Sequence, residues 1–271
     1  MTDPRRVEYL HAIGVDVWVR RDGSGVAEDC AAATSDAMAV DVPARAAGSA
    51  PWPSAVAPSA NAAASLRPPG PVDLRPLDPQ VEAQWDSLRA EVLGCSKCAL
   101  HTTRTQGVFG VGNRRADWLI IGEAPGAEED RQGEPFVGRA GKLLNAMLLS
   151  LGLPREHVFI ANVLKSRPPG NRDPKPDEVA ACLPYLMRQI ALLKPKLMLA
   201  VGRIAAQNLL ATDMPLGRLR GQVHTFGELN TPLIVTYHPA YLLRTPADKR
   251  KAWEDLKFAR SVFRRLAAQE S

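Results

Sequence analysis

The sequence has no apolar run long enough to cross a membrane, and aromatic residues make up only 6% of its 271 positions. At the N-terminus, charged residues and chain breakers stand where a signal peptide would need an apolar core. No internal repeat is present, and no Gly-x-Gly-x-x-Gly turn follows the first expected strand, which disfavours a dinucleotide-binding enzyme. We therefore expect a cytoplasmic protein with no membrane partner.

Composition divides the chain into three parts. Residues 1–20 include a short amphipathic stretch that is too short to fold alone. Residues 21–76 consist mainly of alanine, proline, serine and glycine, and such a segment cannot bury enough apolar surface to offset its ordering entropy. We expect a disordered linker at 21–76 and a folded domain at 77–271. The peptide at 1–20 is then either a lineage-specific tail or a docking segment for a protein partner.

Short apolar segments alternate with amphipathic ones throughout the expected domain. Asp78-Pro79 supplies a helix cap and a proline at the first helical position, and an apolar stripe follows. Strands separated by helical segments imply right-handed crossovers and a parallel sheet. The sequence therefore predicts the α/β class, as a three-layer α/β/α domain with a mainly parallel central sheet. The strands are expected at 117–121, 157–163, 196–201 and 232–237, and the helices at 139–151, 176–193, 203–211 and from about 247.

Residues 122–141 form the most informative segment. They follow the apolar run Trp118-Leu-Ile-Ile121 and precede an apolar-periodic stretch, so a buried strand leads through a long loop into a helix. Most connections in compact domains are only a few residues long, whereas this loop is long and rich in glycine and carboxylates. In open α/β sheets ligands bind beyond the carboxyl ends of the strands, where glycine permits close approach of the backbone. The loop is therefore interpreted as a binding site.

Further motifs follow this loop in a specific order. Gly122-Glu-Ala-Pro-Gly126 and Pro135-Phe-Val-Gly138 precede Asn162, and His238-Pro with Leu242-Leu-Arg244 comes last. This ordered set resembles the uracil-DNA glycosylase superfamily, above all its family 4, iron–sulfur-containing members, over roughly residues 80–265. The resemblance implies a monomeric, monofunctional base-excision repair enzyme. Its substrate would be uracil in single- or double-stranded DNA, from which it would release free uracil and leave an abasic site.

The resemblance also assigns residues to the chemistry. Phe136 would be the flat platform for a flipped base, and Asn162 would read the O4 and N3 edge of uracil. His238 would donate a hydrogen bond to O2, where negative charge develops as the bond breaks. Glu123 would lie in the pocket with its role open between holding water and excluding thymine. Gly122 and Ala124 would line the pocket, although other branches of the superfamily carry a water-positioning aspartate where this chain has Ala124.

DNA contacts are expected from the last motif and from basic side chains. A net charge of +5 suits a polyanionic partner. Leu242 or Leu243 would enter the duplex as a wedge, and Arg244 and Lys165 would hold phosphates. The alternative interpretation of both leucines is that they begin the core face of the last helix.

The cysteines depart from the family pattern. Four thiolates usually hold a [4Fe–4S] cluster, and the resemblance assigns ligands to Cys95, Cys98 and Cys182. Ser166 stands where the third cysteine is expected. Four outcomes stay open: a cluster held by three cysteines and serine or solvent, a three-iron form, recruitment of Cys30, or no cluster. Zinc at the three cysteines is a further alternative. A cluster would be structural, so the chemistry would require no cofactor.

A second function fits the same sequence. The chain could be a DNA-binding protein with weakened glycosylase activity that acts through a partner recruited by its N-terminal extension. The Ser166 departure favours this alternative weakly. The intact set of Glu123, Phe136, Asn162 and His238 favours an active enzyme.

Overall fold

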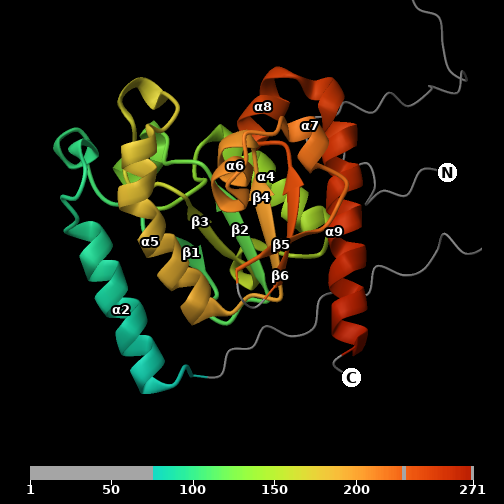
Figure 1. The fold of residues 1–271 in the computed structure, drawn as a ribbon, viewed down its shortest axis with the longest axis horizontal. Coiled ribbons are helices and arrows are strands. Elements are labelled where there is room, and N and C mark those ends of the chain that lie inside the picture. The colour runs from blue at the N-terminus through green and yellow to red at the C-terminus, as the bar shows by residue number, and fades with distance from the viewer. Residues whose placement is uncertain (1–75, 228–229, 270–271) are drawn as a thin grey trace, which may run out of the picture. The chain divides into compact units, whose positions relative to one another are not determined.

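The computed structural model describes residues 76–227 and 230–269 (Figure 1). The expected N-terminal peptide, nearly all of the expected linker and Cys30 lie outside these residues, so those expectations stay predictions. The first described helix, α2 (Pro79–Leu93), begins as the sequence predicts, because the Asp78 carboxylate accepts a hydrogen bond from the backbone N–H of Gln80 at 2.8 Å.

Six strands form one sheet in the order β1-β3-β2-β4-β6-β5. The four central strands are parallel, and the two edge strands run antiparallel to their neighbours. The central strands confirm the mainly parallel sheet, whereas neither edge strand was expected, because both are too short to show an alternating pattern. The strands are β1 (Val111–Gly112), β2 (Trp118–Gly122), β3 (Phe159–Asn162), β4 (Leu197–Val201), β5 (His224–Phe226) and β6 (Thr231–Thr236).

Helices cover both faces of the sheet, which confirms the three-layer class. Because side chains alternate along a strand, Leu119 and Ile121 of β2 point to one face, and Trp118 and Ile120 point to the other. The first face packs against α2, α5 (Pro176–Leu193) and α6 (Arg203–Leu210). The second packs against α4 (Arg139–Ser150), α8 (Pro239–Arg244) and α9 (Lys249–Gln269). Figure 1 shows α2 and α5 on one side of the strands and α9 on the other.

Short helices occupy the connections. The expected C-terminal helix is α9, which begins two residues later than predicted, and α8 is a separate short helix directly after His238. None of the helices in the described part of the chain is long and apolar enough to cross a membrane. The remaining short helices are α3 (Ala127–Gln132), α7 (Leu216–Leu219) and the 3-10 turns η1 (Ala99–Thr102), η2 (Arg155–His157), η3 (Pro169–Asn171) and η4 (Pro246–Asp248).

Candidate active site

The carboxyl ends of four neighbouring parallel strands bring the predicted residues together. Gly122 at the end of β2 is opposite Asn162 at the end of β3. On the other side of β2, β4 leads into Gly202, and β6 beyond it leads into His238. The sheet order therefore places segments that are far apart in sequence along one edge, which is where open α/β sheets bind ligands.

Phe136 lies beside Gly122 and His238 in this row. A Cβ added to Gly122 would come within 2.5 Å of the Phe136 ring, and that ring lies 5.6 Å from the His238 ring at an interplanar angle of 32°. Only glycine therefore fits at position 122. Phe136 adopts a φ of 54°, a left-handed conformation that is uncommon for an aromatic residue. An aromatic ring in such a conformation, held beside Gly122 and His238, is consistent with the predicted platform.

Asn162 points an unsatisfied oxygen at the same place. A Cβ on Gly122 would approach Asn162 Oδ1 to 2.4 Å, so the amide lies directly beside the end of β2. The residue is 2% exposed, and Oδ1 has no hydrogen-bond partner in the protein. A buried amide oxygen without a partner costs free energy unless a ligand or water completes it. The side chain is thus arranged to accept a hydrogen bond from a molecule in the pocket.

The protonation of His238 follows from its surroundings. The backbone N–H of Ala240 donates to His238 Nδ1 at 3.1 Å, so a neutral ring carries its proton on Nε2. Burial and, to a smaller extent, the charge of Arg244 lower the pKa of His238 to about 4, although Glu129 opposes the shift. The ring is therefore neutral at pH 7, with Nδ1 engaged and Nε2 free to donate. Gly202 permits this placement, because a Cβ there would come within 2.9 Å of the His238 Cβ.

Glu123 follows Gly122 and faces an ion pair. Burial and, to a smaller extent, the charge of Asp173 raise the pKa of the Glu123 carboxyl to about 7, although Arg203 opposes the shift. Arg203 Nη2 lies 2.8 Å from Asp173 Oδ2, so the ion pair screens much of either charge. Glu123 can thus gain or lose a proton near neutral pH. The next residue, Ala124, has no polar side chain to assist it.

Side-chain hydrogen bonds to backbone groups hold the rest of the motif loop in place. Glu129 Oε1 accepts hydrogen bonds from the backbone N–H groups of Val137 and Gly138, each at 2.9 Å. Arg155 was not predicted to belong to the site, yet its guanidinium donates to the backbone oxygens of Pro135 and Phe136. Its position in a turn after α4 carried no sequence signal. Gly202, by contrast, could have been found, because it ends an apolar strand and precedes a helix as Gly122 does.

Comparison with known proteins agrees with this geometry. The sequence profile of the uracil DNA glycosylase superfamily matches residues 109–257, which is more than half of the chain. The chain belongs to the uracil-DNA glycosylase superfamily. It is 46% identical over 178 residues to the type-4 uracil-DNA glycosylase of Archaeoglobus fulgidus, a match that covers 64% of this chain and 89% of that protein. It is 40% identical to the type-4 enzyme of Thermotoga maritima over 68% of this chain and 97% of that protein. It is 41% identical to the type-4 uracil-DNA glycosylase of Sulfurisphaera tokodaii over 65% of this chain and 84% of that protein.

Two of the expected DNA contacts in this glycosylase do not fit the structure. Lys165 is 1% exposed, and its Nζ donates to the backbone oxygen of Asn162 at 2.8 Å and to Gln189 Oε1 at 2.6 Å. The prediction that Lys165 holds a phosphate is therefore wrong, because the ammonium is enclosed by protein acceptors. Leu242 is 1% exposed and packs in the core, as the alternative interpretation held for it. Leu243 is only partly buried and Arg244 is exposed, so these two keep their predicted roles as a proposal.

Three cysteines, Cys95, Cys98 and Cys182, lie close enough together to influence one another electrostatically. Burial raises the pKa of the Cys182 thiol, and Cys98 and Cys95 are close enough to add to the rise. The Ser166 hydroxyl instead accepts a hydrogen bond from Arg104 Nη1 at 2.8 Å. Among the described residues, no group of three or more cysteine, histidine, aspartate or glutamate side chains could hold a metal ion. The Ser166 hydroxyl, hydrogen-bonded to Arg104, thus stands where the resemblance expects a cysteine thiolate, and binding of a cluster stays a prediction.

Proposed function

We propose that this uracil-DNA glycosylase binds a flipped uracil between Phe136, Asn162 and His238 and hydrolyses its N-glycosidic bond. The substrate is uracil in single- or double-stranded DNA, and the products are free uracil and an abasic site. The observation that carries the proposal is the buried Asn162 Oδ1 without a partner, beside the Phe136 ring and within the row that ends at His238. Such an amide suits the O4 and N3–H edge of uracil, because it offers one donor and one acceptor side by side.

The bond breaks as the base takes up the electron pair of the C1′–N1 bond. Negative charge then grows on O2 and O4 of the leaving uracil, and positive charge grows on the sugar. A neutral His238 donates from Nε2 to O2, and this hydrogen bond strengthens as the charge develops. Water adds to C1′ of the sugar, and the proton that it loses to solvent is balanced by the one that the uracil anion takes up, which completes the hydrolysis.

Discrimination between bases follows from the same contacts. Cytosine presents an amino donor where uracil has the acceptor O4, and an acceptor N3 where uracil has the donor N3–H. An Asn162 amide that is oriented for uracil therefore faces a donor with its donor and an acceptor with its acceptor. Thymine differs only by the methyl group at C5. We propose that Glu123, at the end of β2, lies close to the reacting base and either occupies the space near C5 or holds the attacking water.

DNA engagement is assigned to the segment after His238. Leu243 is the proposed wedge, since Leu242 is committed to the core. Arg244 is the proposed phosphate contact, because it is exposed in the last turn of α8. The relatives do not support the alternative of a DNA-binding protein with faded activity, since the matched type-4 proteins are named as glycosylases.

The experiment that tests the proposal is a single-turnover assay with three labelled oligonucleotides that carry uracil, cytosine or thymine at one position. After alkaline treatment, we expect strand cleavage only at uracil. Asn162→Leu should lose most of this activity, because leucine keeps the volume of the side chain but neither donates nor accepts. Undiminished cleavage by Asn162→Leu would contradict the assigned pocket. Cleavage at none of the three bases by the wild-type protein would contradict the activity itself.

A further inference from the structure

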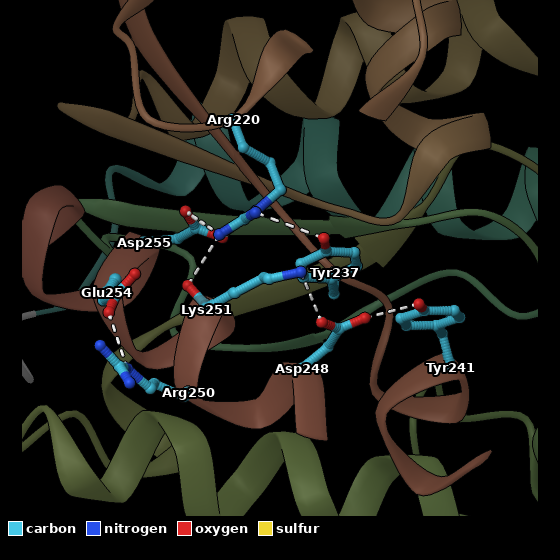
Figure 2. A network of polar contacts seen from close by, with 8 residues as sticks. All are labelled: Arg220, Tyr237, Tyr241, Asp248, Arg250, Lys251, Glu254 and Asp255. Carbon is cyan, nitrogen blue, oxygen red and sulfur yellow. Dashed lines mark hydrogen bonds and ion pairs between the residues drawn. The ribbon is translucent and has the colours of Figure 1, made fainter. Parts of the chain in front are cut away.

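A connected set of polar side chains includes Tyr237 and Tyr241, which lie on either side of His238 in the sequence (Figure 2). The segment that carries His238 begins with Thr236 and Tyr237 at the end of β6. Thr236 Oγ1 donates to Asp255 Oδ2 of α9 at 2.8 Å, and neither residue is more than 3% exposed. The last residue of the strand before the catalytic segment is therefore fixed to the long C-terminal helix.

Arg220, which follows α7, links this helix to Tyr237. Its Nε and Nη2 donate to the two oxygens of Asp255 at 2.7 and 2.8 Å, and Nη2 also donates to the backbone oxygen of Lys251 at 2.8 Å. The guanidinium lies 4.4 Å from the centre of the Tyr237 ring, and Nη1 donates to the Tyr237 hydroxyl at 3.3 Å. One planar cation thus binds the helix and the residue directly before His238.

The other side of His238 is fixed in the same way. The Tyr241 ring stacks on Tyr237 at 5.1 Å and 13°, so the residues that flank His238 pack on each other. The Tyr241 hydroxyl donates to Asp248 Oδ2 at 2.6 Å, and Lys251 Nζ lies 2.8 Å from Asp248 Oδ1. Figure 2 shows these residues joined through Asp248 and Lys251.

We propose that Arg220 is a positioning residue of the glycosylase, which acts through Tyr237 and Tyr241 to hold His238 in the orientation that aims its Nε2 at the base. A buried ion pair adds little net stability, because desolvation offsets most of the attraction. Its directional hydrogen bonds, however, fix one geometry. The inference rests on the proposed role of His238 as the donor to O2.

The test uses Arg220→Lys, which keeps the positive charge beside Asp255 but replaces a five-donor fork with a single point charge. Lysine cannot bind both oxygens of Asp255, the Lys251 carbonyl and the Tyr237 ring together. Tyr241→Phe is the milder companion, since it removes the hydrogen bond to Asp248 and keeps the stacked ring. The matched control is Glu254→Gln, which breaks the exposed ion pair with Arg250 on the same helix.

A double-mutant cycle separates positioning from general stability. We expect Arg220→Lys to slow single-turnover uracil release about tenfold or more, because a misplacement of about 1 Å can cost a factor of 100. Affinity for uracil-containing DNA should change less than twofold. In the His238→Ala background, Arg220→Lys should slow release less than twofold further, since the group that it positions is gone. Tyr241→Phe should slow uracil release in the same way but by a smaller factor, and Glu254→Gln should release uracil at the wild-type rate.

Equal slowing by Arg220→Lys in both backgrounds would overturn the proposal, and so would a lower melting temperature with an unchanged rate. If uracil release by His238→Ala is as fast as by the wild type, the failure lies in the proposed role of His238 instead. NMR gives a second measurement that needs no activity. In Arg220→Lys the NMR signals of the His238 ring should change position between pH 7.5 and 5.5, because a loosened and hydrated imidazole gains a proton in that range. A His238 signal as constant as in the wild type would contradict positioning.

Discussion

Replacing His238 by alanine removes the proposed donor and changes the transition state more than the ground state. In the proposed mechanism the bond that is lost runs from Nε2 of a neutral, half-buried imidazole to the uracil oxygen on which charge develops, and the structure supports the neutral ring with Nδ1 engaged. Removing one such donor typically slows an enzyme by about 10²–10³, or about 2.7–4 kcal/mol. Loss of the ring that packs beside Phe136 adds to this effect, so we expect a reduction near 10³. DNA affinity should stay almost unchanged, because the bond is weak until charge appears.

The same substitution also removes a helix cap. His238 Nδ1 accepts from the Ala240 N–H at the start of α8, and loss of a cap costs about 0.5–2 kcal/mol of stability. His238→Asn is therefore the matched control, since asparagine is a good N-cap but is too short to replace Nε2. Melting temperatures show whether the cap is restored.

The assay is single-turnover excision at saturating enzyme, with DNA affinity measured separately. We expect His238→Asn to recover stability relative to His238→Ala while its rate stays low. A rate that recovers together with stability would show that His238 acts by capping α8 and not by donating a hydrogen bond to the uracil. A rate within threefold of the wild type in His238→Ala would refute the electrostatic argument outright.

Three further predictions concern other parts of the site. Because the Glu123 pKa rises from an ordinary value of 4.5 to about 7, its stabilising protonated form is lost as pH rises through 7, so Glu123→Gln should raise the melting temperature more at pH 8 than at pH 5. The dependence of the wild-type rate on pH should also bend near pH 7. An identical bend in Glu123→Gln would show that another group, and not the Glu123 carboxyl, causes it. Ser166→Cys should raise the iron content per purified chain and its visible absorbance, and no change in either would mean that the ancestral cluster site is gone. Leu243→Ala should slow excision from double-stranded DNA more than from single-stranded DNA, and equal slowing would argue against a wedge.

The part of the fold that positions the site was predictable from the sequence. The four parallel strands are short apolar runs that end at, or within two residues of, a glycine, asparagine or histidine, and the helices between them have clear apolar stripes. That pattern fixes the class, because a strand buried on both faces must be covered by helices on both. The edge strands β1 and β5 were missed, since two or three residues with mixed burial carry no periodic signal.

Side-chain direction was not predictable in the same way. Lys165 is three residues beyond Asn162 in a basic stretch, and its charge suggested a phosphate contact. In the structure it turns inward, where the carbonyl of Asn162 and the Gln189 amide receive it. Burial lowers its pKa to about 7, so the enclosed amine need not carry a full charge. Charge in a sequence indicates which partners a side chain can have, but only packing decides whether that partner is DNA or the protein itself.

The same limit explains why the sequence indicated His238 but not the residues that hold it. His238 belongs to an ordered motif, whereas Arg220 and Asp255 are 35 positions apart and look like ordinary surface charges on either side of a strand. They meet because the end of α7 and the helix α9 both pack against β6, and the two side chains are only 14% and 3% exposed. A buried pair that contributes little net stability is informative when its hydrogen bonds converge on one segment. Here they converge on the residues that flank His238, so the ion pair bears on the geometry of the reaction more than on the stability of the fold.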